Sequence, residues 1–168
     1  QRLYGPRDQG GTLLLKPVQN SFTVLGQAYV ELRLTDNQAG GLAARIGRTD
    51  IDLPYINRQD SRMVPNTFEG VGLSGRLSPQ WETTLTYVTR MKQRNSDQFI
   101  PVSEAAGLLD TDEHLAVGGL RWSPVEGFNI GAMSLYAREF MNTFYTEANY
   151  STILGATMLG SDIGVSLS

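Results

Sequence analysis

The sequence predicts an all-β fold, specifically an antiparallel transmembrane β-barrel, and three patterns support this prediction. First, apolar and polar residues alternate, and between residues 23 and 34 the even positions are all apolar or small. A period of two is typical of a strand with one apolar and one polar face. Second, short and long connections alternate between the strands, as in barrels with tight turns on one side. Third, the 168 residues include 18 glycines and seven prolines, which favours turns over long helices.

Taken in order, the alternating segments predict seven strands and one further short strand. The predicted strands, with the short one first, are residues 12–16, 23–34, 40–48, 67–77, 81–91, 113–122, 128–138 and 149–159. The predicted short turns are residues 35–39, 78–80 and 123–127. The predicted long loops are residues 49–66, 92–112 and 139–148. No boundary divides the chain, so residues 1–168 are expected to be one partial barrel domain.

The apolar phase of each strand is expected to contact lipid. In chain order, the expected outward residues are Val24, Val30, Leu42, Ala44, Ile46, Val71, Leu73, Leu77, Trp81, Leu85, Tyr87, Ala116, Gly118, Leu120 and Trp122. The strand at 113–122 is ambiguous because Leu115 and Val117 share the opposite phase with Arg121. We assign the phase of Trp122 outward because Trp81, Trp122 and Phe128 then lie beside short turns, as in an interfacial aromatic girdle.

The opposite phase is expected to line a water-filled interior. An arginine facing lipid at the middle of the bilayer costs about 2–4 kcal/mol, so the arginines of this phase should point inward. The candidate pore-lining residues are Tyr29, Arg33, Arg45, Arg76, Arg90 and Arg121. Spread at different heights, the arginines could form a ladder for anions. A wet wall with scattered charges, offset by Glu31, Glu82 and Glu113, is the equally open alternative.

Composition excludes several other classes of function. The chain has no cysteine, a net charge of −3 and a mean hydropathy of −0.22. Thiolate catalysis, common zinc clusters and a general attraction for nucleic acid are therefore excluded. No apolar run approaches the roughly 18 residues that a helical membrane span requires.

The aromatic residues Phe140, Phe144 and Tyr145 are expected to pack within the loop 139–148.

Two motifs have simpler explanations than catalysis or cofactor binding. Residues 70–75 spell G-x-G-x-x-G, but a dinucleotide site needs a helix to begin there, whereas this segment alternates like a strand. His114, the only histidine, follows Asp110, Asp112 and Glu113 and is expected to lie at a solvated loop end rather than in a metal site. We therefore expect no enzyme activity, no cofactor and no metal.

Residues 60–70 read DSRMVPNTFEG, which resembles the signature of the OprD family of outer-membrane porins. The resemblance implies a larger barrel of 18 strands, of which this chain supplies about seven or eight. It also implies passive, substrate-specific diffusion of small carboxylate-bearing nutrients past lumenal arginines and inward-folded loops. The motif residues expected to organise the loop are Asp60, Arg62, Pro65, Phe68 and Gly70, with Asp60 and Arg62 as structural partners.

The leading hypothesis is therefore a piece of a bacterial outer-membrane porin that passes small carboxylate solutes through an arginine-lined pore. Its expected surroundings are outer-membrane lipid and lipopolysaccharide, with a homotrimer as one assembly open to it and no nucleic acid partner. Two alternatives remain: a small eight-stranded barrel acting as an anchor or adhesin, and a soluble β-sandwich that binds carbohydrate. The sandwich would bury the apolar phase in a protein core.

Overall fold

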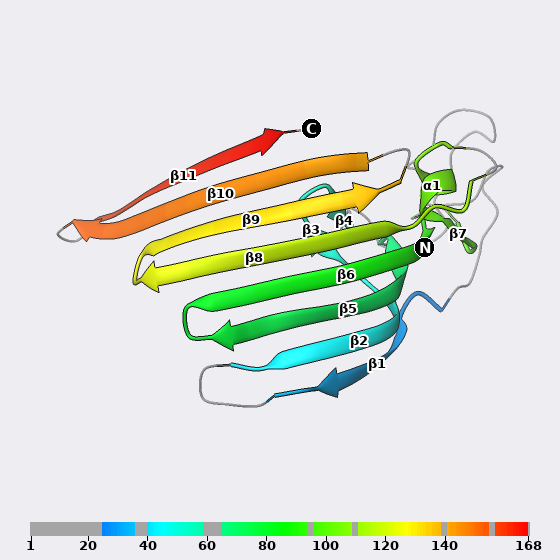
Figure 1. Cartoon of the computed structure of the whole chain (residues 1–168), viewed down its shortest axis with the longest axis horizontal. Coiled ribbons are helices and arrows are strands. Elements are labelled where there is room, and N and C mark those ends of the chain that lie inside the picture. The colour runs from blue at the N-terminus through cyan, green and yellow to red at the C-terminus, as the bar shows by residue number, and fades with distance from the viewer. Residues whose placement is uncertain are drawn as a thin grey trace, which may run out of the picture.

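In the computed structural model the described residues form one large curved antiparallel sheet, and β3 (Asp52–Leu53) and β4 (Ile56–Asn57) form a separate two-stranded hairpin (Figure 1). The structure describes residues 25–35, 40–58, 65–93, 96–108, 111–138, 141–154 and 157–167. Among these, the long strands follow one another in sheet order as β1 (Ala28–Arg33), β2 (Leu42–Thr49), β5 (Thr67–Ser78), β6 (Trp81–Lys92), β8 (Leu115–Val125), β9 (Phe128–Ala137), β10 (Met141–Leu154) and β11 (Thr157–Leu167). The other short elements are β7 (Phe99–Pro101) and α1 (Val102–Ala105).

Six of the predicted strands are confirmed to within a few residues, and the C-terminal part of the prediction is wrong. β10 occupies residues 141–154, where a long loop was expected, and the predicted strand at 149–159 spans the end of β10 and the start of β11. Polar residues lie on both faces of β10, including Asn142 and Thr146 on one face and Thr143 on the other, so alternation is weak there. Phe144 and Tyr145 therefore lie in a strand and not in a loop, and Phe140 lies outside the described residues. The predicted strand 12–16 lies outside the described residues.

The face of the sheet assigned to lipid, called here the outer face, carries exposed apolar side chains. Val30 is 61% exposed and Ile46 is 54% exposed. Trp81 and Trp122 pair across β6 and β8 and stack with their ring centroids 5.8 Å apart. A soluble sandwich would bury these residues, so their exposure supports contact with lipid. Leu115 and Val117 point to the opposite, inner face, as the assignment of Trp122 requires.

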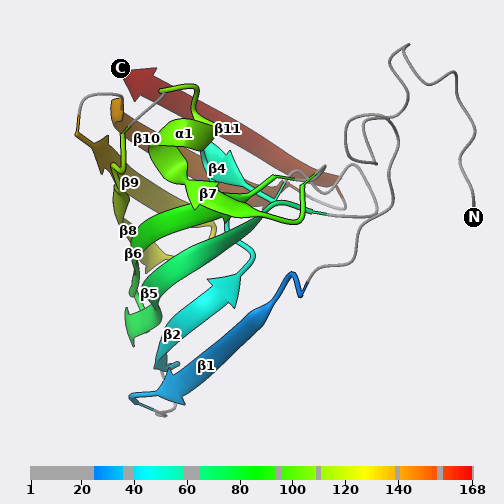
Figure 2. The same cartoon turned by 90° about the vertical axis from the view of Figure 1, so that its right-hand side faces the viewer.

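The inner face is polar at the end of the sheet that has short turns and apolar at the other end. At the apolar end, the long connections fold over the inner face and form a core with it. The core consists of Ile51, Ile56, Phe68, Val88, Val102, Leu115, Val117, Leu135 and Ala137. Figure 2 shows β4 inside the curve of the sheet. Burial of each large side chain contributes roughly 1.5–3 kcal/mol, which fixes the folded-in connections on the sheet.

A β-bulge between β5 and β6 changes which way one predicted arginine points. Gly70 pairs with Val88, whereas the preceding Glu69 pairs with Arg90, so β6 carries one extra residue. Neighbouring residues of β5 face opposite sides, and paired residues face the same side. Arg90 therefore lies on the outer face, opposite to Val88. Strict alternation along the strand predicts that Arg90 lines the pore. This prediction is wrong because the bulge turns Arg90 to the outer face.

The glycine motif at residues 70–75 lies entirely within β5, with no helix following it. A side chain at Gly70 would collide with the backbone carbonyl of Tyr87 at the bulge, so the close approach of two strands explains this glycine. Among the described residues, no helix is long and apolar enough to cross a membrane.

Candidate pore wall and constriction

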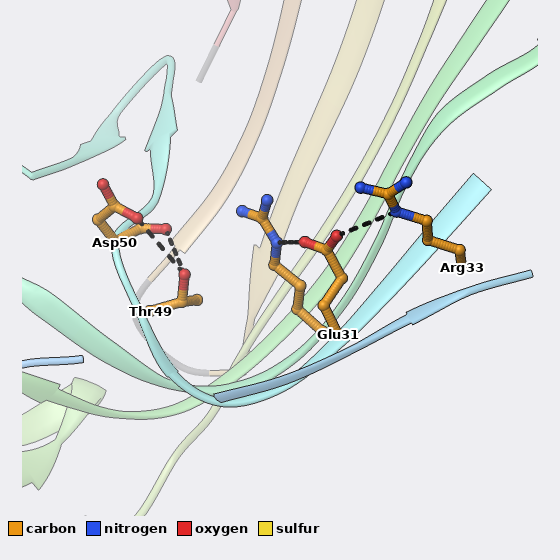
Figure 3. A network of polar contacts seen from close by, with 5 residues as sticks. Glu31, Arg33, Thr49 and Asp50 are labelled. Carbon is orange, nitrogen blue, oxygen red and sulfur yellow. Dashed lines mark hydrogen bonds and ion pairs between the residues drawn. The ribbon is translucent and has the colours of Figure 1, made fainter. Parts of the chain in front are cut away.

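Two arginines share one carboxylate on the inner face of β1 and β2. Glu31 pairs with Arg45 across the two strands, and the Arg45 Nε lies 2.8 Å from the Glu31 Oε2. The Arg33 Nε lies 3.8 Å from the other carboxylate oxygen of Glu31. Figure 3 shows Glu31 and Arg33 projecting from the same side of the ribbon. This Glu31 triad (Glu31, Arg33 and Arg45) therefore carries one excess positive charge.

Tyr29 lies beside the same group. The Arg45 Cζ is 5.3 Å from the centroid of the Tyr29 ring, within the range of a cation–π contact. The Arg33 side chain is 77% exposed and its contact with Glu31 is long, so it is the most accessible cation of the Glu31 triad. A solute anion can approach it without displacing the shorter bond between Arg45 and Glu31.

A second row of charges crosses the inner face near the short turns. Arg76 pairs with Glu82, and its Nε lies 2.8 Å from the Glu82 Oε1. Arg121 is the cross-strand neighbour of Glu82 and forms an ion pair with Glu147 on β10. The residue between Arg121 and Glu147 is Gly131, whose lack of a side chain lets the two reach each other over β9. The charges of this row cancel in pairs.

The β3–β4 hairpin projects over the inner face and narrows the space above this row. The Arg58 guanidinium lies 3.5 Å from Asp50 and 3.7 Å from Asp52, which ties the two ends of the hairpin together. At its tip, the Tyr55 ring meets the Tyr145 ring of β10 edge to face, with centroids 6.3 Å apart. The hairpin is thus attached to the sheet at its base by the core and at its tip by an aromatic contact.

A cavity of about 270 Å³ lies between the hairpin and the strands. Asp52 lines it from the hairpin, and the charged residues Glu82, Arg121 and Glu147 line it from the wall. Tyr145 also lines this space and donates a 3.1 Å hydrogen bond from its hydroxyl to Glu147. The cavity therefore presents both signs of charge and could position a small polar solute in more than one orientation.

Of the motif at residues 60–70, which was expected to organise the loop, the structure describes residues 65–70. Phe68 is 2% exposed and belongs to the core, and Gly70 lies at the bulge. The Pro65 carbonyl accepts a 3.2 Å hydrogen bond from the Nζ of Lys92, whose side chain is fully buried. The predicted pair Asp60 and Arg62 lies outside the described residues.

The sequence pattern alone does not indicate Glu147, Asp52 or Lys92 as site residues. Glu147 falls in a predicted loop, so the sequence does not show that it lies across the sheet from Arg121. Opposite charges on neighbouring strands could indicate the pair, but only when the strand register is known.

His114 lies near the outer face, where its Nδ1 is 2.8 Å from the Tyr87 hydroxyl. Within the described part of the chain, no three His, Cys, Asp or Glu residues form a metal-binding group.

The sequence of this sheet matches a known protein family over most of its length. The model described as outer membrane porin, OprD family, matches residues 5–166. The chain belongs to the OprD family. It is accordingly a bacterial outer-membrane protein, and the porins of its family are channels rather than enzymes. The resemblance stated from residues 60–70 is confirmed.

Solved porins share the fold of this OprD-family chain. A BenF-like porin from Pseudomonas fluorescens Pf-5 matches with a TM-score of 0.77 and 19% identity, over 98% of this chain and 42% of that porin. OccK9 (OpdG) of Pseudomonas aeruginosa matches with a TM-score of 0.76 and 20% identity, over 97% and 42% of the two chains. OccD3 (OpdP) of the same organism has a TM-score of 0.71 at 15% identity, over 85% and 34%. No curated protein matches the sequence significantly.

This OprD-family chain spans less than half the length of the solved porins, and its sheet is open. Within the described strands, β1 and β11 form the two ends of the sheet order and are not paired with each other. A small eight-stranded barrel would close by pairing its first and last strands. The open sheet therefore favours a segment of a larger barrel over the small anchor or adhesin.

Proposed function

We propose that the full-length protein is a passive outer-membrane pore for small solutes and that it favours solutes bearing a carboxylate. The observation that carries this proposal is the Glu31 triad, in which two guanidinium groups share one carboxylate on the inner face. The paired row of Arg76, Glu82, Arg121 and Glu147 adds no net charge, so among these ion pairs of the long strands the triad alone supplies a positive excess. Tyr29 supports Arg45 there.

Passage through such a pore requires binding that is weak and repeated. A solute carboxylate can replace the Glu31 carboxylate as the partner of the exposed Arg33, because the contact between Arg33 and Glu31 is 3.8 Å long. The carboxylates of the wall keep each arginine from holding a solute too tightly, which a conducting pore requires. The four arginines Arg33, Arg45, Arg76 and Arg121 thus act as partners that a solute shares with the wall rather than as a ladder of bare charges.

The β3–β4 hairpin is proposed as the constriction of this segment. Its tip contacts Tyr145, and the cavity beneath it is lined by Asp52, Arg121 and Glu147. A narrow passage with walls of low dielectric strengthens the effect of fixed charges on a passing ion. The hairpin therefore holds passing solutes close to the charges of the wall, and the preference for carboxylates is assigned to the Glu31 triad.

The proposal is tested with the full-length protein in planar lipid bilayers. Replacing both Arg33 and Arg45 by Gln should lower the permeability of acetate relative to that of potassium, measured from the reversal potential in a salt gradient. The matched control is Arg90→Gln, which removes the same type of charge from the outer face. Unchanged selectivity in the double variant, or an equal loss in the control, would remove the Glu31 triad from the mechanism.

A homotrimer stays a prediction, which native mass spectrometry of the purified protein checks.

A further inference from the structure

The bulge between β5 and β6 creates a cationic group on the outer face, at the end of the sheet with long connections. We call the residues Arg48, Glu69, Arg90 and His114 the rim patch. Arg48, Glu69 and Arg90 are neighbours in one cross-strand row over β2, β5 and β6. His114 precedes Leu115, the partner of Val88, and therefore lies beside the bulge on the same face as Arg90.

The rim patch lies just beyond a row of outward aromatic residues. Tyr87 and Tyr136 are both cross-strand neighbours of Ala116, and they are 43% and 56% exposed. Tyrosine at this position marks the level where hydrocarbon meets the polar headgroups. Arg90 is three residues beyond Tyr87 along β6, or roughly 7–10 Å once the bulge is allowed for. The rim patch is therefore at headgroup height, and longer connections of such barrels lie on the extracellular side.

The charges of the rim patch are only partly satisfied within the protein. The Arg48 Nε lies 2.6 Å from Glu69, and its guanidinium stacks on the Phe99 ring at 4.2 Å. Arg90 is exposed, and within the described residues no carboxylate lies within 4.0 Å of its guanidinium nitrogens. His114 is bonded to Tyr87, and its Nε2 is 3.7 Å from the exposed Asp112. The row of Arg48, Glu69 and Arg90 thus leaves one cation free for an external anion.

We propose that the rim patch binds the phosphate of a phosphorylated glycolipid headgroup in the outer leaflet, with Arg90 as the main contact. A guanidinium forms paired hydrogen bonds with phosphate, and membrane proteins use such basic groups for anionic headgroups. The apolar outer face continues directly below through Tyr87 and Leu85, which are both exposed. One molecule can therefore place its phosphate on Arg90 and its acyl chains on this surface, which a free anion cannot do.

The experiment uses the full-length porin purified in detergent and titrated with lipid A, followed by native mass spectrometry. The unmodified protein should retain lipid A, and Arg90→Gln should weaken retention by about tenfold, the value of one charge-assisted hydrogen bond to a phosphate. Arg90→Lys should restore part of this affinity. The matched control is Arg76→Gln, which removes an arginine from the inner face and should leave retention unchanged.

Three further arms separate the alternatives. Enzymatically dephosphorylated lipid A should bind as weakly to the unmodified protein as intact lipid A binds to Arg90→Gln, a comparison that does not depend on any variant folding. Inorganic phosphate at the same concentration should not compete, since it lacks the acyl chains. Retention should persist in EDTA. Equal binding of both lipid forms, equal retention by the Arg76 and Arg90 variants, competition by inorganic phosphate, or loss of retention in EDTA through a cation bridge to Glu69 and Asp112 would each overturn the proposal.

Discussion

Replacing Glu31 by Gln is the sharpest test of the proposed pore wall, because it should increase the preference for anions. The substitution keeps the size of the side chain and removes the one negative charge shared by Arg33 and Arg45. The net charge of the Glu31 triad then changes from +1 to +2. Removing a negative charge beside the permeation path favours anions, so the comparison with a carboxylate on the outer face decides whether the Glu31 triad lies on that path.

The size of this effect follows from Coulomb's law. A solute carboxylate about 6 Å from the added charge gains about 0.7 kcal/mol in a water-filled pore, and about four times as much at an effective dielectric constant of 20. The lower figure corresponds to about a threefold rise in anion over cation permeability. Because the charges are exposed, screening by salt should reduce the effect at high ionic strength.

The assay is the reversal potential of the full-length pore in a potassium acetate gradient, recorded at low and high salt. Glu69→Gln is the matched control, since it removes a carboxylate bound to an arginine on the outer face. The reasoning fails if the Glu31 variant becomes less anion-selective, or if the control changes selectivity by the same amount.

Two further predictions concern the wall and its core. Gly131→Val should separate Arg121 from Glu147, because even a Cβ at this position would lie 3.1 Å from the Glu147 side chain; single-channel recordings should show altered conductance, and an unchanged trace would refute this role of Gly131. Phe68→Ala should destabilise the core by about 3–5 kcal/mol, as for other buried aromatic residues. Its heat-induced unfolding on gels should occur at a lower temperature, whereas Phe144→Ala, at an exposed position, should change it far less.

Alternation of residue types was sufficient to predict most strands because each has one face toward lipid and one toward the interior. It failed at β10, where Asn142 and Thr146 bring polar groups to the outer face and hide the period. It failed also at Arg90, because one extra residue in β6 reverses the side on which every later residue lies. The bulge inserts one residue without changing the kinds of residue in the strand, so it leaves no clear signal in a single sequence.

Residue patterns alone predicted the antiparallel sheet and, through residues 60–70, the family. They also selected the arginines Arg33, Arg45, Arg76 and Arg121, since parity within a regular strand assigns each to a face. The carboxylate that each arginine meets could be known only from the folded sheet, because these pairs depend on strand register. The charge that a solute encounters is a property of these pairs, and residues far apart in the chain create it together.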